Sequence, residues 1–336
     1  MLKSLNFEVV QKRVRQFKSA RVLVVGDLIL DEYIWGNVSR ISPEAPIPVV
    51  WVKSENYVPG GACNVALNIQ TLGARAEVCG VVGSEPRGSR LARLLKQRGI
   101  GTSGVLAVRG RPTTIKTRVI AHHQQVVRID RELVAPLSEK LLTRVVTLLK
   151  KRIPEVDAVC IEDYGKGVIT PRLVAEVVHL ARAHKKIITV DPKENHLMYY
   201  RGVTSITPNH HEAAALSGVP IRDDASLWKA GRKLLRILRC ENVLITLGES
   251  GMCLFKKGAK PVKIPTLAQD VFDVSGAGDT VIGTYTLALA CGASYLEAAY
   301  LANCAAGIVV GKVGTATVTT RELLAKVRQV TGPQGA

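Results

Sequence analysis

The chain has 336 residues, of which 47% are hydrophobic, and its 46 Lys and Arg outnumber its 28 Asp and Glu, for a formal net charge of +18. This length suits one large α/β domain with an appendage, or two domains, and the apolar fraction can fill a sizeable core. No run of about 18 uncharged apolar residues occurs, which argues against a transmembrane helix, and no membrane partner is expected. Dispersed charge with 4% aromatic residues disfavours a nucleic-acid-binding protein.

The start of the chain, residues 1–20, lacks the apolar segment of a secretory signal and is expected to form a short amphipathic helix on the outside of the protein. Seven cysteines occur without a CxxC pair, at positions 63, 79, 160, 240, 253, 291 and 304. Their spacing fits reduced thiols in a cytoplasmic protein better than a metal site or a disulfide framework.

The first regular element is the apolar run RVLVVGDLIL at residues 21–30, which predicts a buried parallel strand. Gly26 and Asp27 are expected at or near its end, with Asp31 just beyond. Ligands of open α/β sheets bind near the carboxyl ends of strands. Asp31 is therefore a candidate acceptor for sugar hydroxyl groups, and a simple turn acid is the alternative.

Residues 35–57 are rich in proline and alternate in short stretches, which predicts a small β flap outside the main sheet. The next stretch, PGGACNVA at residues 59–66, places Gly60 and Gly61 before Asn64 at the start of a helix. Such small residues allow the backbone to approach a ligand closely. This helix is expected to continue through Leu72.

Residues 112–120 read PTTIKTRVI, a strand with Lys116 and Arg118 on one face and apolar or small side chains on the other. Two neighbouring cations repel each other unless an anion lies between them. A phosphate clamp on a lid is one interpretation, and a solvated strand face is the other. Further cations add to the positive field of this segment: Arg109, Arg111, Arg128 and Arg131.

From Leu137 onward, helical and strand patterns alternate, which predicts a parallel sheet with one ligand-binding edge. Polar residues follow the strands at positions 163, 191–193, 208–212 and 247–251. His210 and His211 are interpreted as loop residues that point apart rather than as metal ligands.

The stretch DVSGAGDTVIG, residues 273–283, places Gly276, Ala277 and Gly278 directly before Asp279 and an apolar helical run. A helix start offers unpaired N–H groups to an anion. Asp279 would repel a bound phosphate, but it could accept a proton from an attacking hydroxyl group while the amides hold the phosphoryl group. The alternative is a helix cap. Gly278 is expected to adopt a positive φ angle.

Several nucleotide-binding and metal motifs are absent from the sequence: GxxxxGK[ST], GxGxxG, the protein-kinase signature set and HExxH. The two stretches PGGACNVA and DVSGAGD, in this order, instead resemble the signatures of the PfkB, or ribokinase-like, carbohydrate kinases. The resemblance extends from about residue 21 to about residue 330.

A closer resemblance is to the heptose 7-phosphate kinases of lipopolysaccharide precursor synthesis. It rests on residues 26–50 and on EDYGKG, DPK, TPNHHEA and GTATVT, at 162–167, 191–193, 207–213 and 314–319. In many bacteria that kinase is fused to a nucleotidyltransferase, and this chain resembles the stand-alone form or an isolated kinase domain.

The resemblance implies an α/β fold, with a parallel-sheet sandwich in a single kinase domain and a small β-sheet lid formed by residues of about 35–57 and 111–130. The implied reaction is ATP-dependent phosphorylation of the anomeric hydroxyl group of heptose 7-phosphate. Mg²⁺ and a monovalent cation are candidate cofactors, and a homodimer formed through the lid is the expected assembly.

Residue roles also follow from the resemblance. Asp279 would be the catalytic base, with anion-hole amides from 276–278. The expected nucleotide-side residues are Lys193, Asn209, His210, His211, Glu212, Thr246, Gly248, Gly251 and Asn303, with Glu212 near the magnesium ion. The expected sugar-side residues are Asp31, Gly60, Gly61, Asn64, Lys116 and Arg118. One departure from the family is the presence of His122 and His123 before Gln124 and Gln125, where an arginine-bearing loop is expected.

Two alternative functions remain open, one within the kinase class and one outside it. A kinase for an unphosphorylated sugar or a nucleoside would use the same catalytic stretch. A sugar- or nucleotide-binding regulator without catalysis is disfavoured by Asp279, because a protein that only binds has no need of a base.

Overall fold

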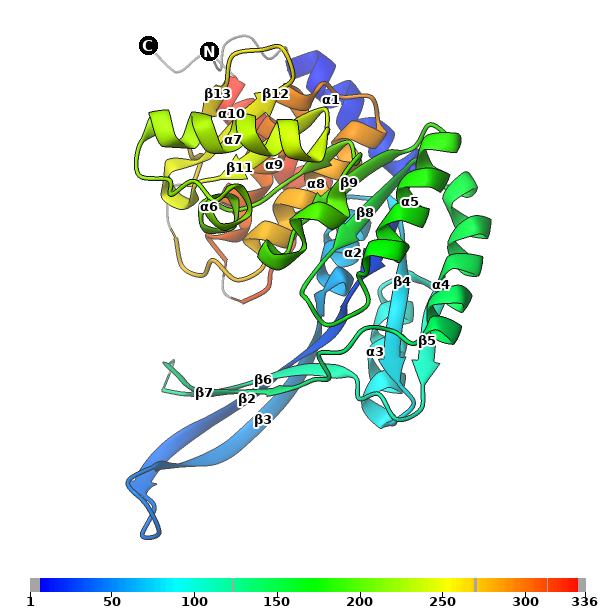
Figure 1. Ribbon diagram of the computed structural model, residues 1–336. Helices are drawn as coiled ribbons and strands as arrows, with labels where there is room; N and C mark the ends of the chain where they lie inside the picture. Colours follow the sequence, from blue (N-terminus) through cyan, green and yellow to red (C-terminus); the bar gives the residue numbers. More distant parts are fainter. Residues whose placement is uncertain (1–6, 123, 269–270, 313, 332–336) are drawn as a thin grey trace, which may run out of the picture.

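The computed structural model describes residues 7–122, 124–268, 271–312 and 314–331. A nine-stranded sheet in the order β13-β12-β11-β10-β9-β8-β1-β4-β5 forms its centre, and a four-stranded sheet in the order β3-β2-β6-β7 projects from it (Figure 1). The central strands are β1 (Arg21–Gly26), β4 (Arg75–Gly83), β5 (Gly101–Val108), β8 (Ala158–Glu162), β9 (Ile187–Asp191), β10 (Ser205–Ile206), β11 (Asn242–Thr246), β12 (Met252–Lys256) and β13 (Val262–Ile264). All neighbours from β5 to β11 pair in parallel, while β12 and β13 pair antiparallel at one edge.

Helices cover both faces of the central sheet, because successive side chains of each strand point to opposite sides. In β1, Val22 and Val24 belong to one buried cluster, and Leu23 and Val25 belong to the other. The first cluster includes α1 (Phe7–Gln16), α2 (Ala62–Thr71), α3 (Pro86–Gln97), α8 (Ala277–Ala290), α9 (Tyr295–Val309) and α10 (Thr320–Thr331). The second includes α4 (Glu139–Arg152), α5 (Pro171–Ala183), α6 (His210–Ser217) and α7 (Asp224–Leu238). The predicted parallel-sheet sandwich with a small β-sheet lid is confirmed.

The lid consists of β2 (Leu28–Ile41), β3 (Pro48–Gly61), β6 (Thr114–Ala121) and β7 (Gln124–Arg131), and its β2–β3 arm reaches far from the body (Figure 1). The predicted buried parallel strand with Gly26 and Asp27 at its end is confirmed as β1, but its continuation to residue 30 is wrong, because β1 ends at Gly26 and the chain enters the lid at Leu28. A side chain at Gly26 would clash with the carbonyl oxygen of Glu162, so the two strands approach closely at this exit. Asp31 therefore lies within lid strand β2 rather than just beyond a central strand.

Two local predictions have opposite outcomes. The alternation of residues 114–121 is confirmed, since Ile115, Thr117 and Val119 are buried while Lys116 and Arg118 are half-buried on the other face. The interpretation of His210 and His211 as loop residues is wrong, because they form the first turn of α6. Asn209 and Glu212 make a reciprocal capping box that starts this helix, with Asn209 Oδ1 accepting from the backbone N–H of Glu212 at 2.9 Å.

In the part of the chain that the structure describes, no helix has both the length and the apolar character needed to cross a bilayer. All seven cysteines are free, and all but Cys291 are buried.

Candidate active site

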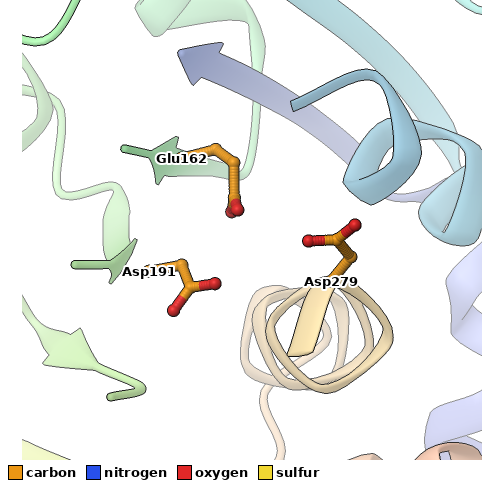
Figure 2. Close-up of side chains that lie close together, drawn as sticks. All are labelled: Glu162, Asp191 and Asp279. Atoms are coloured by element: carbon orange, nitrogen blue, oxygen red, sulfur yellow. The ribbon is translucent and has the colours of Figure 1, made fainter. Parts of the chain in front are cut away.

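Three acidic side chains converge where the central strands end. Glu162 ends β8, Asp191 ends β9 and Asp279 lies in the first turn of α8, and Figure 2 shows their carboxyl groups facing one common space. One carboxylate oxygen from each lies within 4.8 Å of the others. Burial, reinforced by the neighbouring negative charges, raises the pKa of Glu162 and of Asp191 well above the ordinary range. Glu162 and Asp191 lie in stretches that carry the family resemblance, but this cluster was not predicted from the sequence.

Asp279 is buried, and each of its two carboxylate oxygens accepts one hydrogen bond. Its Oδ2 accepts from Asn64 Nδ2 at 2.6 Å, and its Oδ1 accepts from the Tyr164 hydroxyl group at 3.1 Å. Gly276 is the N-cap residue of α8, so the interpretation of Asp279 as a helix cap is wrong. Burial raises the pKa of Asp279 to about 6, although both hydrogen bonds act to lower it. A carboxylate with such a pKa suits proton acceptance near neutral pH.

The loop after β8 holds Tyr164 against Asp279, and Asp27 fixes this loop. Asp27 Oδ2 accepts from the backbone N–H groups of Tyr164 and Lys166, both at 3.0 Å, and its Oδ1 accepts from the backbone N–H group of Val168 at 3.3 Å. The roles of Asp27 and Tyr164 were not predicted from the sequence. An acid at the end of a buried strand, together with the stretch at 162–167, was the only available signal.

Tyr164→Phe tests the electrostatic part of this arrangement. Loss of the hydroxyl group removes one hydrogen bond that favours ionised Asp279, so the pKa of Asp279 is expected to rise. The acid limb of the kcat/KM profile against pH should move to higher pH, while activity well above pH 7 changes little. Tyr300→Phe is a matched control, because Tyr300 lies in α9 among core residues near Val10 and Val327. An unshifted acid limb in Tyr164→Phe would contradict the assignment of that limb to Asp279.

Gly276 and Gly278, which precede Asp279, differ in backbone conformation. Gly276 has φ +76°, and a Cβ there would lie 2.9 Å from Asn64 Nδ2, whereas Gly278 does not have positive φ. The prediction of a positive φ at Gly278 is therefore wrong, because Gly278 already lies inside α8. A Cβ at Gly278 would meet only Asp191 Oδ2, at 3.9 Å, so its side-chain position faces open space.

Gly278→Val is therefore expected to keep the fold and to lose activity. A valine side chain would enter the space before the loop amides and hold a phosphoryl group away from them. Because valine is a better helix former than glycine, the substitution should not lower the stability of α8. kcat/KM for ATP and the melting temperature are the measurements. Normal activity in a folded variant would show that the loop does not approach the phosphate.

A cavity of about 470 Å³ adjoins the same loop, and it includes Ala277 and Gly278. Four of the predicted nucleotide-side residues line it: Thr246, Gly248, Gly251 and Asn303. Apolar side chains, including Val271, Val274 and Val281, cover much of its wall. An apolar cleft beside a set of helix N-terminal amides can receive a flat ring next to an anionic group.

The other predicted nucleotide-side residues lie outside the lining of this cavity. Glu212 and Asn209 cap α6, while the rings of His210 and His211 have their centres 3.9 Å apart in its first turn. The charge of Glu212 contributes to raising the pKa of Asp191, after burial. Lys193 Nζ lies 3.6 Å from a carboxylate oxygen of its neighbour Glu194.

Two of the predicted sugar-side residues, Asp31 and Arg118, form a largely buried ion pair between the lid strands. Arg118 Nη1 lies 2.6 Å from Asp31 Oδ1. A side chain at Gly60 would clash with the Asp31 carboxylate, so glycine is needed where β3 passes this pair. Gly61 has φ +54°, and a Cβ there would clash with the carbonyl oxygen of Asp27 instead. Arg118 thus already has an anion within the protein.

Lys116 is different from Arg118. Its Nζ lies 5.0 Å from the centre of the Tyr164 ring, and it makes no ion pair within the described residues. Burial lowers the pKa of Lys116. A half-buried ammonium group without a carboxylate partner, next to the ring that contacts Asp279, is placed to receive an anionic group of a substrate.

Other cations of this segment have structural partners. Arg111 donates to the carbonyl oxygens of Ala135, Leu133 and Lys166, and Arg128 pairs with Asp130. His122 Nε2 lies 3.0 Å from the carbonyl oxygen of Val38 and links the end of β6 to β2, whereas His123 lies outside the described residues.

Comparison with known proteins gives consistent results. A family model described as pfkB family carbohydrate kinase matches residues 19–321. The bifunctional protein HldE of Desulfatibacillum aliphaticivorans is 51% identical over 315 residues, which cover 94% of this chain and 64% of that protein. The bifunctional protein HldE of Geobacter metallireducens is 48% identical, over 91% of this chain and 63% of that protein. This chain thus spans just under two thirds of the length of these relatives.

Solved structures share the fold at lower identity. A ribokinase of Arabidopsis thaliana complexed with ribose and ATP has a TM-score of 0.73 at 20% identity, covering 92% of this chain and 99% of that chain. Phosphofructokinase-2 of Escherichia coli, in complex with substrates and products, has a TM-score of 0.75 at 18% identity, covering 93% and 99%.

Proposed function

This chain belongs to the pfkB family of carbohydrate kinases, and from that premise we propose that it transfers the γ-phosphoryl group of ATP to the anomeric hydroxyl group of a heptose 7-phosphate. The product would be the 1,7-bisphosphate, a precursor in lipopolysaccharide core synthesis. The observation that carries the proposal is the buried Asp279 between a glycine loop beside a cavity and a cationic lid. The choice of a heptose rests on the resemblance of residues 26–50 and 207–213 to heptose 7-phosphate kinases.

In the proposed mechanism, Asp279 takes the proton of the attacking hydroxyl group as the oxygen–phosphorus bond forms. Asn64, which donates to Asp279 at 2.6 Å, would keep the carboxylate aimed at that hydroxyl group, and Asp31 would orient the sugar. Backbone amides of residues 276–279 would neutralise charge that grows on the transferred group. The apolar cavity beside the loop would hold the base of the nucleotide.

The acidic cluster has the donor chemistry for Mg²⁺, which prefers carboxylate oxygens. Glu162 Oε2 is buried and has no hydrogen-bond partner among the described residues, so it is free to act as a ligand. We assign Glu162 and Asp191 to the ion, with Glu212 as a further acid nearby, because both oxygens of Asp279 already accept hydrogen bonds. A divalent cation bound there would offset the negative charge of the nucleotide phosphates. A requirement for a monovalent cation rests on the family resemblance alone.

The lid also supports the proposal of a homodimer. Strand β7 is exposed along its whole length, and large apolar side chains are exposed on the lid at Ile41, Ile47, Trp51, Val127 and Ile129. Apolar patches of this kind are typical of interfaces between protein chains. A mass determination in solution would test the assembly, with twice the mass of one chain as the expected result.

Product analysis tests the reaction itself. Phosphorus NMR of the protein incubated with ATP, Mg²⁺ and a heptose 7-phosphate should show a new anomeric phosphate together with ADP. Formation of ADP without a new sugar phosphate, or no turnover at all, would overturn the proposal.

A further inference from the structure

A second hollow lies at the edge of the central sheet opposite the acidic cluster, where strands β9 and β10 begin. A cavity of about 600 Å³ is lined there by the end of α5, the start of β9 and the turn between α8 and α9. Five of its lining residues are cations and one is an acid, Glu241. The cations are Arg182, Lys185, Lys186, Arg239 and Lys256. An adjoining cavity of about 910 Å³ shares Arg239 and Lys256 and adds three more cations.

These cations have no counter-charge of their own. None of the five forms an ion pair with any residue that the structure describes. The Glu241 carboxylate, the single acid in the lining, accepts a hydrogen bond from the Tyr295 hydroxyl group. Like charges gathered around one hollow raise its positive potential and concentrate anions in it.

Backbone strain at two of the cations strengthens the case. Among the described residues, three non-glycine residues have positive φ, and two of them line this cavity: Lys185 at +55° and Arg239 at +53°. Arg239 directly follows α7, and Lys185 follows the C-cap residue of α5. Both lie at helix C-termini, where a left-handed residue is most often glycine. A cation is favoured near a helix C-terminus, but a side chain in this conformation is strained.

We propose that this cavity binds a small molecule that carries two or more phosphate groups, at a site separate from the catalytic one. Its volume is in the range of ordinary small-molecule sites. The lining carries five cations and one carboxylate, and that carboxylate already accepts a hydrogen bond from Tyr295. Such a charge excess favours a ligand with several phosphate charges over a ligand with one carboxylate or a neutral sugar. The half-buried Tyr295 on the wall offers a flat ring beside Lys256, whose Nζ lies 5.9 Å from the ring centre.

The test uses the double variant Lys185→Gly/Arg239→Gly. Glycine removes both charges and relieves both positive φ angles, so the melting temperature should stay the same or rise. Calorimetric titration with inorganic pyrophosphate should show, in the parent protein, a site whose affinity falls at least about 10-fold in the variant. Pyrophosphate that binds at the catalytic site should bind equally to the parent and to the variant. It therefore does not contribute to the difference in affinity between the two proteins.

The matched control is Lys150→Ala/Lys151→Ala, which removes the same charge from the exposed end of α4. This control should bind pyrophosphate like the parent. Equal pyrophosphate binding by all three proteins, or an equal loss in both double variants, would overturn the proposal.

Parallel titrations with ADP and with a sugar bisphosphate would identify which class of phosphorylated molecule the cavity binds. The true ligand class should bind more tightly than pyrophosphate and should lose affinity in the glycine variant.

Discussion

Replacing Asp279 with asparagine is expected to lower kcat by about 10²- to 10⁴-fold, the usual contribution of a general base, with little change in nucleotide affinity. The substitution preserves the local geometry. An asparagine side chain can still accept from Asn64 Nδ2 through its oxygen and donate to the Tyr164 hydroxyl oxygen through its amide group. The loss would therefore report on proton acceptance rather than on folding.

Two measurements complete that test. Asp224→Asn serves as the matched control, because Asp224 is an exposed carboxylate of α7 that pairs with Lys263 at 2.5 Å, and its loss should leave kcat unchanged. The parent enzyme should also lose kcat/KM as the pH falls through about 6, because protonated Asp279 cannot accept a proton. A folded Asp279→Asn variant with near-normal turnover would show that Asp279 is not the catalytic base.

Lys116→Ala is expected to weaken the use of a phosphorylated sugar by roughly 10- to 150-fold, because a hydrogen bond to a charged group contributes about 1.5–3 kcal/mol. The use of a free sugar and the KM for ATP should hardly change. Of the two cations on this face of β6, Lys116 is the one that has no carboxylate partner among the described residues. Lys140→Ala, at an exposed position of α4, is the matched control for loss of a lysine.

Arg118→Ala should behave differently from Lys116→Ala. The sequence predicts the same effect for both cations, but the ion pair with Asp31 separates them. Removal of Arg118 leaves a buried carboxylate unpaired, so kcat/KM should fall for free and phosphorylated sugars alike. Equal losses for both sugars in Lys116→Ala as well would mean that Lys116 supports the lid rather than the sugar phosphate.

Much of the fold could be predicted because local patterns determine it. The alternation of residues 114–121 follows from burial of one face, and the glycine pair before Ala62 marks the start of α2. The end of β1 before Asp27 could not be predicted from such a pattern. The apolar run continues past Asp27, although the chain passes there from the central sheet to the lid sheet. His210 and His211 could have been assigned to a helix, since Asn209 and Glu212 have capping-box spacing.

Individual residues of the candidate site could be predicted from the sequence, but the contacts between their side chains could not. Asp279 and Asn64 stand out from their neighbours in the sequence, yet they are 215 residues apart and only the fold brings them to 2.6 Å. Glu162 and Asp191 end adjacent strands, so their proximity follows from a sheet order that the sequence does not reveal. The ion pair between Asp31 and Arg118 could not be predicted either. It depends on the pairing of β2 with β6 in the lid, which local sequence patterns do not reveal.

The most direct test of the account is the ratio of kcat/KM for a heptose 7-phosphate to kcat/KM for the free heptose, measured with ATP and Mg²⁺ on the parent enzyme. The account predicts a preference of at least about 10-fold for the phosphorylated sugar, with phosphate added at the anomeric position. Equal use of the two sugars would contradict it and would identify a kinase whose lid does not recognise a phosphate.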